Sequence, residues 1–195
     1  FGTGGVYECF VENARAGMLY KYRIHQTDGR VLDRADPYGY AMELRPNSAS
    51  VLVDLDYAFK DAAWLQRRAE RPHYNEPMSI YEMHFGSWRR KAEEGPAGWY
   101  SYEALCGQLL DYVQKHGFTH VEFLPLTEYP ADESWGYQVS GFYSATSRYG
   151  APAELQYLID TFHQAGIGVI LDFVPVHFAT NDYALTQFDG SALYE

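Results

Sequence analysis

The stretch IGVILDFVPVHF, residues 167–178, decides the fold class of this chain. It begins as a continuous apolar run, typical of a strand covered on both faces in a parallel sheet, and it ends in a proline-containing loop. Two similar segments precede it, SIYEMHF at residues 79–85 and THVEFLPL at residues 119–126. Segments with a helical period separate the three, at residues 101–117 and 151–166. Strands and helices therefore alternate, which predicts a parallel sheet with helical crossovers.

Both helical segments carry their own start and stop signals. Ser101 stands at the N-cap position of the first, and Gly117 follows its last turn. Gly166 ends the second in the same way. The apolar residues of each segment fall on one face, as expected for helices that cover a sheet. A doubly wound sheet and a (β/α)8 barrel both fit this order, and the pattern leaves the two open.

The first third of the chain has a different pattern, made of short β-strand signals. Asp28-Gly29 stands between two such segments and is a strong signal for a two-residue hairpin. Short strands with turn residues between them indicate part of a β-sandwich. The expected strands are GVYECFV at residues 5–11, MLYKYRIH at residues 18–25 and SVLVDL at residues 50–55.

The two patterns meet at a proline-containing linker, RPHYNEPM at residues 71–78. A brief helical turn is expected just before it, at residues 62–70. We therefore predict two domains. A partial β-sandwich occupies residues 1–73, and an α/β domain occupies residues 74–195.

The charge of the 195-residue chain limits the classes of partner that it is expected to bind. It has 26 acidic and 15 basic residues, a formal net charge of −11. Nucleic acids and anionic membranes require clustered Lys and Arg, so neither is an expected partner. No apolar run approaches the ~20 residues of a membrane-spanning helix. A neutral ligand can bind such an acidic protein without electrostatic repulsion.

The two cysteines, Cys9 and Cys106, fall in different predicted domains. This separation argues against a disulfide framework. We therefore expect a reducing compartment and a cytoplasmic protein.

Aromatic residues make up 17% of the chain, and several gather in SWGYQVSGFYSATSRYG, residues 134–150. Apolar residues there keep neither the strand nor the helix period, which predicts an ordered loop. Its only charged residue is Arg148. Tyrosine-rich strands and a surface that grips a sugar ring explain the aromatic composition equally well.

Candidate functional groups follow the third predicted strand. Asp172 lies where the apolar run stops, at the edge of a parallel sheet that carries function in such folds. His177 follows after Pro175, so both polar groups could reach one cleft. The alternative, that Asp172 ties down a loop and His177 is an ordinary exposed imidazole, is equally open. As metal ligands the two lack a third partner at close spacing, so no metal site is expected.

Glu82 and Glu122 offer a second candidate, a carboxylate pair of the glycosidase type. Both stand within predicted strands, whereas catalytic groups stand at strand ends in these folds. We therefore interpret them as buried structural acids with hydrogen-bond partners.

Four segments resemble, in order, the bacterial 1,4-α-glucan branching enzymes of the α-amylase superfamily. The similarity runs from about residue 78 to residue 195, and a looser one to their glucan-binding-type β-sandwich covers the first part of the chain. The segments are residues 79–88 (SIYEMHFGSW), 120–130 (HVEFLPLTEYP), 134–178 and 188–195 (FDGSALYE).

The resemblance implies a fold and a set of site residues. The second domain would hold the first three strands of a (β/α)8 barrel. Asp172 would support the site, His177 would contact the sugar being cleaved, and Tyr137 would stack under that sugar. Trp135 and Gln138 would line the site. The remaining aromatic residues of the loop, Phe142, Tyr143 and Tyr149, are expected to pack the loop itself.

The resemblance also implies a neutral glucan partner, such as amylose or glycogen, and no cofactor. Many amylases carry Asn before the conserved His, whereas this chain has Val176. That departure favours branching enzymes over calcium-binding amylases, so no structural calcium is expected.

Catalysis in this family is retaining, with a carboxylate nucleophile and a second carboxyl group as acid and base. Both belong to later strands, so the resemblance places them beyond Glu195 and assigns no catalytic residue to this chain. The chain therefore resembles an internal fragment, which we expect to be inactive. Three barrel strands cannot close, so self-association through the exposed edge is also expected.

Two other functions remain open at this point. One is a non-catalytic glucan-binding unit that uses the β-sandwich and the aromatic loop. The other is part of a related debranching or trehalose-releasing hydrolase. The segments at residues 172–178 (DFVPVHF) and 188–195 argue against the hydrolase.

Overall fold

Three parallel strands form the central sheet of the structure, a computed structural model that describes residues 4, 8–26, 28–72 and 74–192. The strands are β5 (Ile80–Met83), β6 (His120–Phe123) and β9 (Gly168–Leu171), in the order β5-β6-β9. Every pairing between them is parallel. The predicted parallel sheet with helical crossovers is confirmed.

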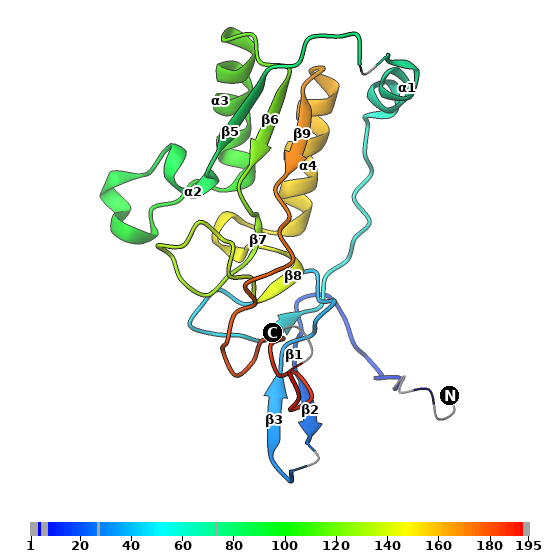
Figure 1. Cartoon of the computed structure of the whole chain (residues 1–195), viewed down its shortest axis with the longest axis vertical. Coiled ribbons are helices and arrows are strands. Elements are labelled where there is room, and N and C mark those ends of the chain that lie inside the picture. The colour runs from blue at the N-terminus through cyan, green and yellow to red at the C-terminus, as the bar shows by residue number, and fades with distance from the viewer. Residues whose placement is uncertain (1–3, 5–7, 27, 73, 193–195) are drawn as a thin grey trace.

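Helices α3 (Tyr102–Lys115) and α4 (Pro152–Gln164) lie together on one side of this sheet (Figure 1). Their apolar faces pack on the sheet and form the main core. Full burial of a Leu or Phe side chain stabilises a fold by about 1.5–3 kcal/mol. The fully buried side chains of this core include Leu105, Leu109, Val113, Val121, Phe123, Leu158 and Phe162.

The helix ends match their sequence signals. Ser101 Oγ accepts a hydrogen bond from the backbone N–H of Ala104 at 3.2 Å, which is an N-cap contact. Gly117 and Gly166 take φ values of +75° and +83° after α3 and α4. A side chain at either position would disfavour that left-handed backbone. All three predicted boundaries are confirmed.

Replacing Ser101 with alanine is expected to lower the free energy of unfolding by about 1 kcal/mol, because the N–H of Ala104 loses its acceptor. Urea denaturation measures the change. Ser101→Asp keeps an oxygen acceptor at the same place and should match the unsubstituted chain within a few tenths of a kcal/mol. Equal destabilisation by both variants would show that the cap does not act through this hydrogen bond.

Glu82 and Glu122 occupy neighbouring positions of β5 and β6. The alternation of side chains along a strand turns both to the face opposite the one on which α3 and α4 pack. Glu82 is exposed and Glu122 is half-buried, and neither side chain forms a hydrogen bond among the described residues. The interpretation of the two as buried acids with partners is therefore wrong.

The N-terminal part forms two antiparallel ribbons of two strands each. One joins β1 (Leu19–Tyr20) to β4 (Ser50–Val51), and the other joins β2 (Tyr22–His25) to β3 (Val31–Arg34). Gly29 takes a φ of +86° between β2 and β3, so the hairpin predicted at Asp28-Gly29 is confirmed. Its predicted two-residue loop is wrong, because the last pair of the ladder is His25 with Val31 and five residues connect the strands.

Two strand predictions differ from the structure here. Residues 8–11 are irregular and exposed, because no strand pairs with them among the described residues. The rest of that predicted strand, residues 5–7, lies outside the described residues. The prediction for residues 50–55 holds only for Ser50–Val51, since pairing with β1 stops there.

The chain then runs through α1 (Ala62–Glu70), a longer helix than the brief turn predicted, before it enters the sheet. Trp64 of α1 is buried and stacks on the ring of His163 of α4, with centroids 5.1 Å apart. Asp61 pairs with the same imidazole at 2.7 Å. The segment that joins the N-terminal part to β5 is thus held against α4, the helix that packs on the sheet beside α3.

Short elements fill the remaining connections. Strand β8 (Gly141–Ala145) pairs antiparallel with β7 (Thr127–Glu128), so the prediction of residues 134–150 as a loop throughout is wrong. The other elements are helix α2 (Phe85–Trp88) and the 3-10 segments η1 (Ala92–Ala97, kinked at Gly95) and η2 (Ser147–Tyr149). None of the helices in the described ranges is long and apolar enough to cross a bilayer.

The N-terminal ribbons are fastened to the loops that extend from the sheet. Ser144 Oγ of β8 donates to the carbonyl oxygen of Gly39 at 2.6 Å. The N–H of Ala35 donates to the carbonyl oxygen of Tyr183 at 3.0 Å. Arg34 donates to the carbonyl oxygen of Phe188 at 3.2 Å. In Figure 1 the ribbons accordingly lie against β8 and the C-terminal segment, at the far end from α1.

Candidate functional site

Two buried charged residues anchor the aromatic loop, residues 134–150. Glu128 ends β7 and Arg148 lies in η2, and their side chains are 6% and 0% exposed. Arg148 Nη1 lies 2.7 Å from Glu128 Oε1. Such a buried ion pair is stable only when its other donors and acceptors are satisfied.

Most of those groups have partners. Glu128 Oε2 accepts hydrogen bonds from the backbone N–H and the hydroxyl of Ser147, both at 2.7 Å. Arg148 donates to Asp132 Oδ1 at 2.9 Å and to the carbonyl oxygen of Tyr129 at 2.7 Å. Its guanidinium also lies 3.9 Å from the centre of the Tyr129 ring, a cation–π contact. Arg148 Nη2 is buried without a hydrogen-bond partner within the described part of the chain.

The loop passes close to the segment after β6 at Gly136. This glycine has a φ of +98°, and a Cβ there would lie 2.8 Å from the carbonyl oxygen of Pro125. Only glycine meets both conditions without strain. The close approach leads directly into Tyr137 and brings that residue to the end of the sheet.

Tyr137 and Asp172 meet at this end of the sheet. The Tyr137 hydroxyl donates a hydrogen bond to Asp172 Oδ2. Asp172 directly follows β9, and its N–H donates to the carbonyl oxygen of Phe123 at the end of β6, at 2.9 Å. Both side chains are half-buried, so a ligand in solution can reach them. The carboxyl end of parallel strands is where α/β folds place their ligands.

The electrostatics of this pair keep the tyrosine neutral. The hydrogen bond to the Asp172 carboxylate, helped by partial burial, raises the pKa of Tyr137 to about 12. The charges of Asp172, Glu82 and Glu122 act in the same direction. Tyr137 therefore remains a hydrogen-bond donor at neutral pH, and the site presents a negative carboxylate beside an aromatic ring.

Replacing Asp172 with asparagine is expected to lower the pKa of Tyr137 from about 12 toward its ordinary value of 10.0, because the anionic acceptor is lost. A raised pKa in the folded state means that neutral Tyr137 stabilises the fold fully below pH 10. That contribution is lost as the pH rises through 12. Difference absorbance of the tyrosines against pH follows this titration, and Tyr137→Phe identifies its signal. An unchanged pKa in Asp172→Asn would contradict the hydrogen bond as its cause.

His177 lies in the turn that follows β9 and takes a φ of +56°, a conformation uncommon for residues other than glycine. Such outliers persist only where the surroundings fix them, and they gather at functional turns. Its side chain is exposed and forms no hydrogen bond in the part of the chain that the structure describes. Its contact with a sugar therefore remains a prediction.

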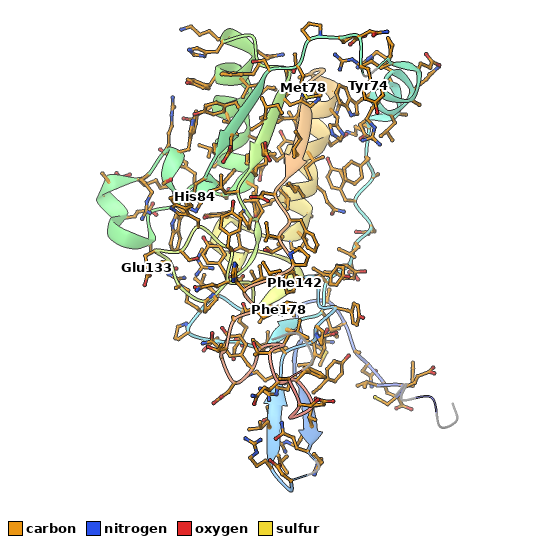
Figure 2. All side chains as sticks on the ribbon, viewed as in Figure 1. Tyr74, Met78, His84, Glu133, Phe142 and Phe178 are labelled. Atoms are coloured by element: carbon orange, nitrogen blue, oxygen red, sulfur yellow. The ribbon has the colours of Figure 1, made fainter. Side chains whose placement is uncertain are left out.

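Aromatic contacts hold that turn against the loop. Phe142 of β8 contacts Phe173 and Phe178, with ring centroids 5.8 Å and 4.8 Å apart. Figure 2 shows Phe142 and Phe178 side by side at the junction with the N-terminal ribbons. The N–H of Ala179 donates to the carbonyl oxygen of Val139 at 3.1 Å. The turn that carries His177 is thus fixed on both sides.

Trp135 and Gln138, the other predicted site residues, flank the Gly136–Tyr137 segment and are exposed. Neither forms a hydrogen bond within the described ranges, so their part in lining the site also stays a prediction. The described residues contain no group of three or more His, Cys, Asp or Glu side chains that could hold a metal ion.

The remaining aromatic residues of the loop have separate roles. Tyr149 is buried in the main core against Phe85, with ring centroids 4.8 Å apart, so the prediction that it packs only the loop is wrong. Tyr143 is exposed and stacks on Tyr38 from the N-terminal part, and Phe142 contacts Phe173 and Phe178, so the prediction that these two pack the loop itself is also wrong. The sequence interpretation missed these contacts and the Glu128–Arg148 pair. The one available signal for the pair was the lone charge of Arg148 in an otherwise uncharged stretch.

Known protein families match two parts of the chain. The model described as "Alpha amylase, catalytic domain" matches residues 106–191. The model described as "Carbohydrate-binding module 48 (Isoamylase N-terminal domain)" matches residues 1–39. The first match includes all five predicted site residues.

Curated relatives match the chain over its whole length. A 1,4-alpha-glucan branching enzyme GlgB of Nocardia farcinica is 48% identical over 194 residues, which are 100% of this chain and 25% of the relative. One of Geobacillus stearothermophilus is 49% identical over 192 residues, which are 98% of this chain and 30% of the relative. The chain thus spans between a quarter and a third of the length of these relatives.

Solved structures show the same fold. A crystal structure described as an alpha amylase from Salmonella typhimurium aligns with a TM-score of 0.67 and 27% identity, over 90% of this chain and 27% of that one. The GBS pullulanase SAP aligns with a TM-score of 0.61 and 23% identity, over 83% of this chain and 25% of that one.

Proposed function

Because this polypeptide chain belongs to the 1,4-α-glucan branching enzyme family, we propose that it forms part of an enzyme that cleaves α-1,4-glucan. That enzyme transfers the released glucan segment to a 6-hydroxyl of a glucan. The observation that supports this most directly is the Tyr137–Asp172 hydrogen bond at the carboxyl end of the sheet. An aromatic ring beside an open carboxylate suits a sugar, which offers an apolar face and hydroxyl donors. The product would be the α-1,6 branch of glycogen.

Each site residue has a proposed role in holding the sugar at the point of cleavage. The ring of Tyr137 stacks under it. Asp172 accepts hydrogen bonds from its hydroxyls through Oδ1, which has no hydrogen-bond partner among the described residues, and His177 donates to it. Trp135 and Gln138 line the same cleft.

The chemistry of the proposed reaction is retaining, with one carboxylate as nucleophile and another as acid and base. The proposal assigns neither role to Glu82 or Glu122, because both stand within strands rather than at the strand ends. It places both catalytic carboxylates beyond Glu195 in the whole protein. The three-stranded sheet is then the first part of a (β/α)8 barrel, and residues 1–73 and 74–195 are separate domains.

The proposal also covers the partners and the compartment of the enzyme, and the behaviour of this chain on its own. Its partners are amylose and glycogen, and its compartment is the cytoplasm. The chain on its own is proposed to lack turnover. Its exposed sheet edge is proposed to favour self-association, which analytical ultracentrifugation would detect as a concentration-dependent mass.

Product analysis tests the proposed function in the whole protein. Incubation with amylose should lower the iodine stain and create α-1,6 linkages, which proton NMR resolves, without a matching rise in reducing ends. A rise in reducing ends without new linkages would instead identify a hydrolase. An unchanged iodine stain together with no new α-1,6 linkages would contradict action on α-1,4-glucan.

A further inference from the structure

Two tyrosines from distant parts of the chain form an exposed stack outside the site described above. Tyr38 belongs to the turn after β3 and Tyr143 to β8, and their ring centroids are 5.4 Å apart with an interplanar angle of 28°. The two residues are 71% and 55% exposed. Neither hydroxyl forms a hydrogen bond among the described residues. The stack therefore buries little surface, and core packing does not account for it.

The turn that carries Tyr38 is held rigidly. The N–H of Tyr38 donates to Asp36 Oδ1 at 2.9 Å, and the N–H of Asp36 donates to Ser50 Oγ at 2.8 Å. Asp36 Oδ2 accepts the hydroxyl of Tyr20 at 2.6 Å. The N–H of Gly39 closes the turn by donating a hydrogen bond to the carbonyl oxygen of Asp36 at 3.1 Å. Tyr38 is thus presented to solvent on a fixed backbone.

A buried hydrogen bond joins that turn to the strand that carries the second ring. Ser144, next to Tyr143, is 1% exposed and donates to the carbonyl oxygen of Gly39, next to Tyr38. This bond sets the register of the two tyrosines across 105 residues of chain. The two exposed rings therefore form one pre-organised aromatic surface, which lowers the entropic cost of binding a ligand.

We propose that the Tyr38–Tyr143 stack is a second glucan-binding site, which holds an α-1,4-glucan chain by ring stacking away from the Tyr137–Asp172 site. The ligand class follows from two observations. The carbohydrate-binding module match, residues 1–39, includes Tyr38. The net charge of −11 disfavours polyanions, while a neutral sugar has no such penalty. The ligand class rests on the proposed function, but the location does not depend on Tyr137.

Affinity electrophoresis of the chain in gels that contain glycogen tests this site. Tyr38→Ala and Tyr143→Ala should each raise the dissociation constant for glycogen by about two- to tenfold, the range expected for one aromatic contact. Tyr38→Phe and Tyr143→Phe keep the rings and should bind as the unsubstituted chain does. The double alanine variant should lose less than the product of the two single effects, because both rings serve one surface.

Tyr74→Ala is the matched control. Tyr74 is also an exposed tyrosine, but it lies beside α1, well apart from Phe142 of β8 (Figure 2). Its removal should leave glycogen binding unchanged. Thermal unfolding of each variant checks that the alanine substitutions leave the fold intact.

Three outcomes would overturn the proposal. In the first, the unsubstituted chain and both alanine variants bind glycogen equally, while Tyr137→Ala binds it more weakly. The proposed function would then stand without a second site. Another is an alanine effect on mobility in gels without glycogen, which would mark the stack as a contact between two copies of the chain. The third is no retardation of the unsubstituted chain by glycogen.

Discussion

Replacing Arg148 with methionine is expected to lower the free energy of unfolding by about 3–5 kcal/mol. The substitution keeps most of the side-chain volume but removes the charge. Glu128 would then remain buried at 6% exposure without its cation. Breaking one half of a buried ion pair is costly because the other charge is left desolvated and unpaired. Asp132 and the carbonyl oxygen of Tyr129 would lose a donor as well.

Urea denaturation measures this loss, and two variants make the test specific. Arg23→Met removes an ion pair with Asp33 in which both side chains are exposed, and it should leave the unfolding midpoint nearly unchanged. Adding Glu128→Gln to Arg148→Met removes the stranded charge and should restore part of the lost stability. A loss below about 1 kcal/mol in Arg148→Met would mean that water reaches the pair.

The second large effect concerns Asp172. In the whole enzyme, Asp172→Asn is expected to lower kcat/KM on amylose by between about ten- and hundredfold, because hydrogen bonds to a charged group contribute about 1.5–3 kcal/mol. The carboxylate holds the Tyr137 hydroxyl and, in the proposed function, the hydroxyls of the sugar. The loss of the charge weakens both contacts at once.

The initial rate of the iodine assay measures the effect of Asp172→Asn. Asp111→Asn, an exposed carboxylate on α3 and thus outside the sheet end, is the control and should keep full activity. A matching urea midpoint for Asp172→Asn would show that the loss is not a folding defect. Activity within twofold of the unsubstituted enzyme would exclude Asp172 from the sugar-binding role.

Local signals in the sequence were enough to predict the frame of the structure. The strand at residues 168–171, the helix start at Ser101 and the stop at Gly117 depend on neighbours within a few residues. Strand β8 was missed because its partner β7 has two residues and a register shift, so its pairing depends on contacts far along the chain. The position of Glu82 and Glu122 on the face away from α3 and α4 likewise depends on which face the helices cover, and the sequence of a single strand does not contain this information.

For the candidate site too, local sequence signals predicted some features, and contacts between distant residues decided the others. The position of Asp172 at a strand end follows from the apolar run before it, and the resemblance to branching enzymes pointed to Tyr137. Their hydrogen bond joins residues 35 positions apart and became visible only in the structure. The Tyr38–Tyr143 stack has no sequence signature at all, because it forms between two segments that are 105 residues apart in the chain.

The contact between Arg34 and the carbonyl oxygen of Phe188 has a consequence for how the protein is made. The two residues are 154 positions apart. At about 5–20 residues per second, the ribosome delivers the acceptor roughly 8–30 seconds after it has made the donor. During that interval the β2–β3 hairpin lacks its final partner, and an isolated two-stranded hairpin is marginally stable at best. The β2–β3 hairpin therefore completes its native contacts only after the 154 residues that follow Arg34 have been made.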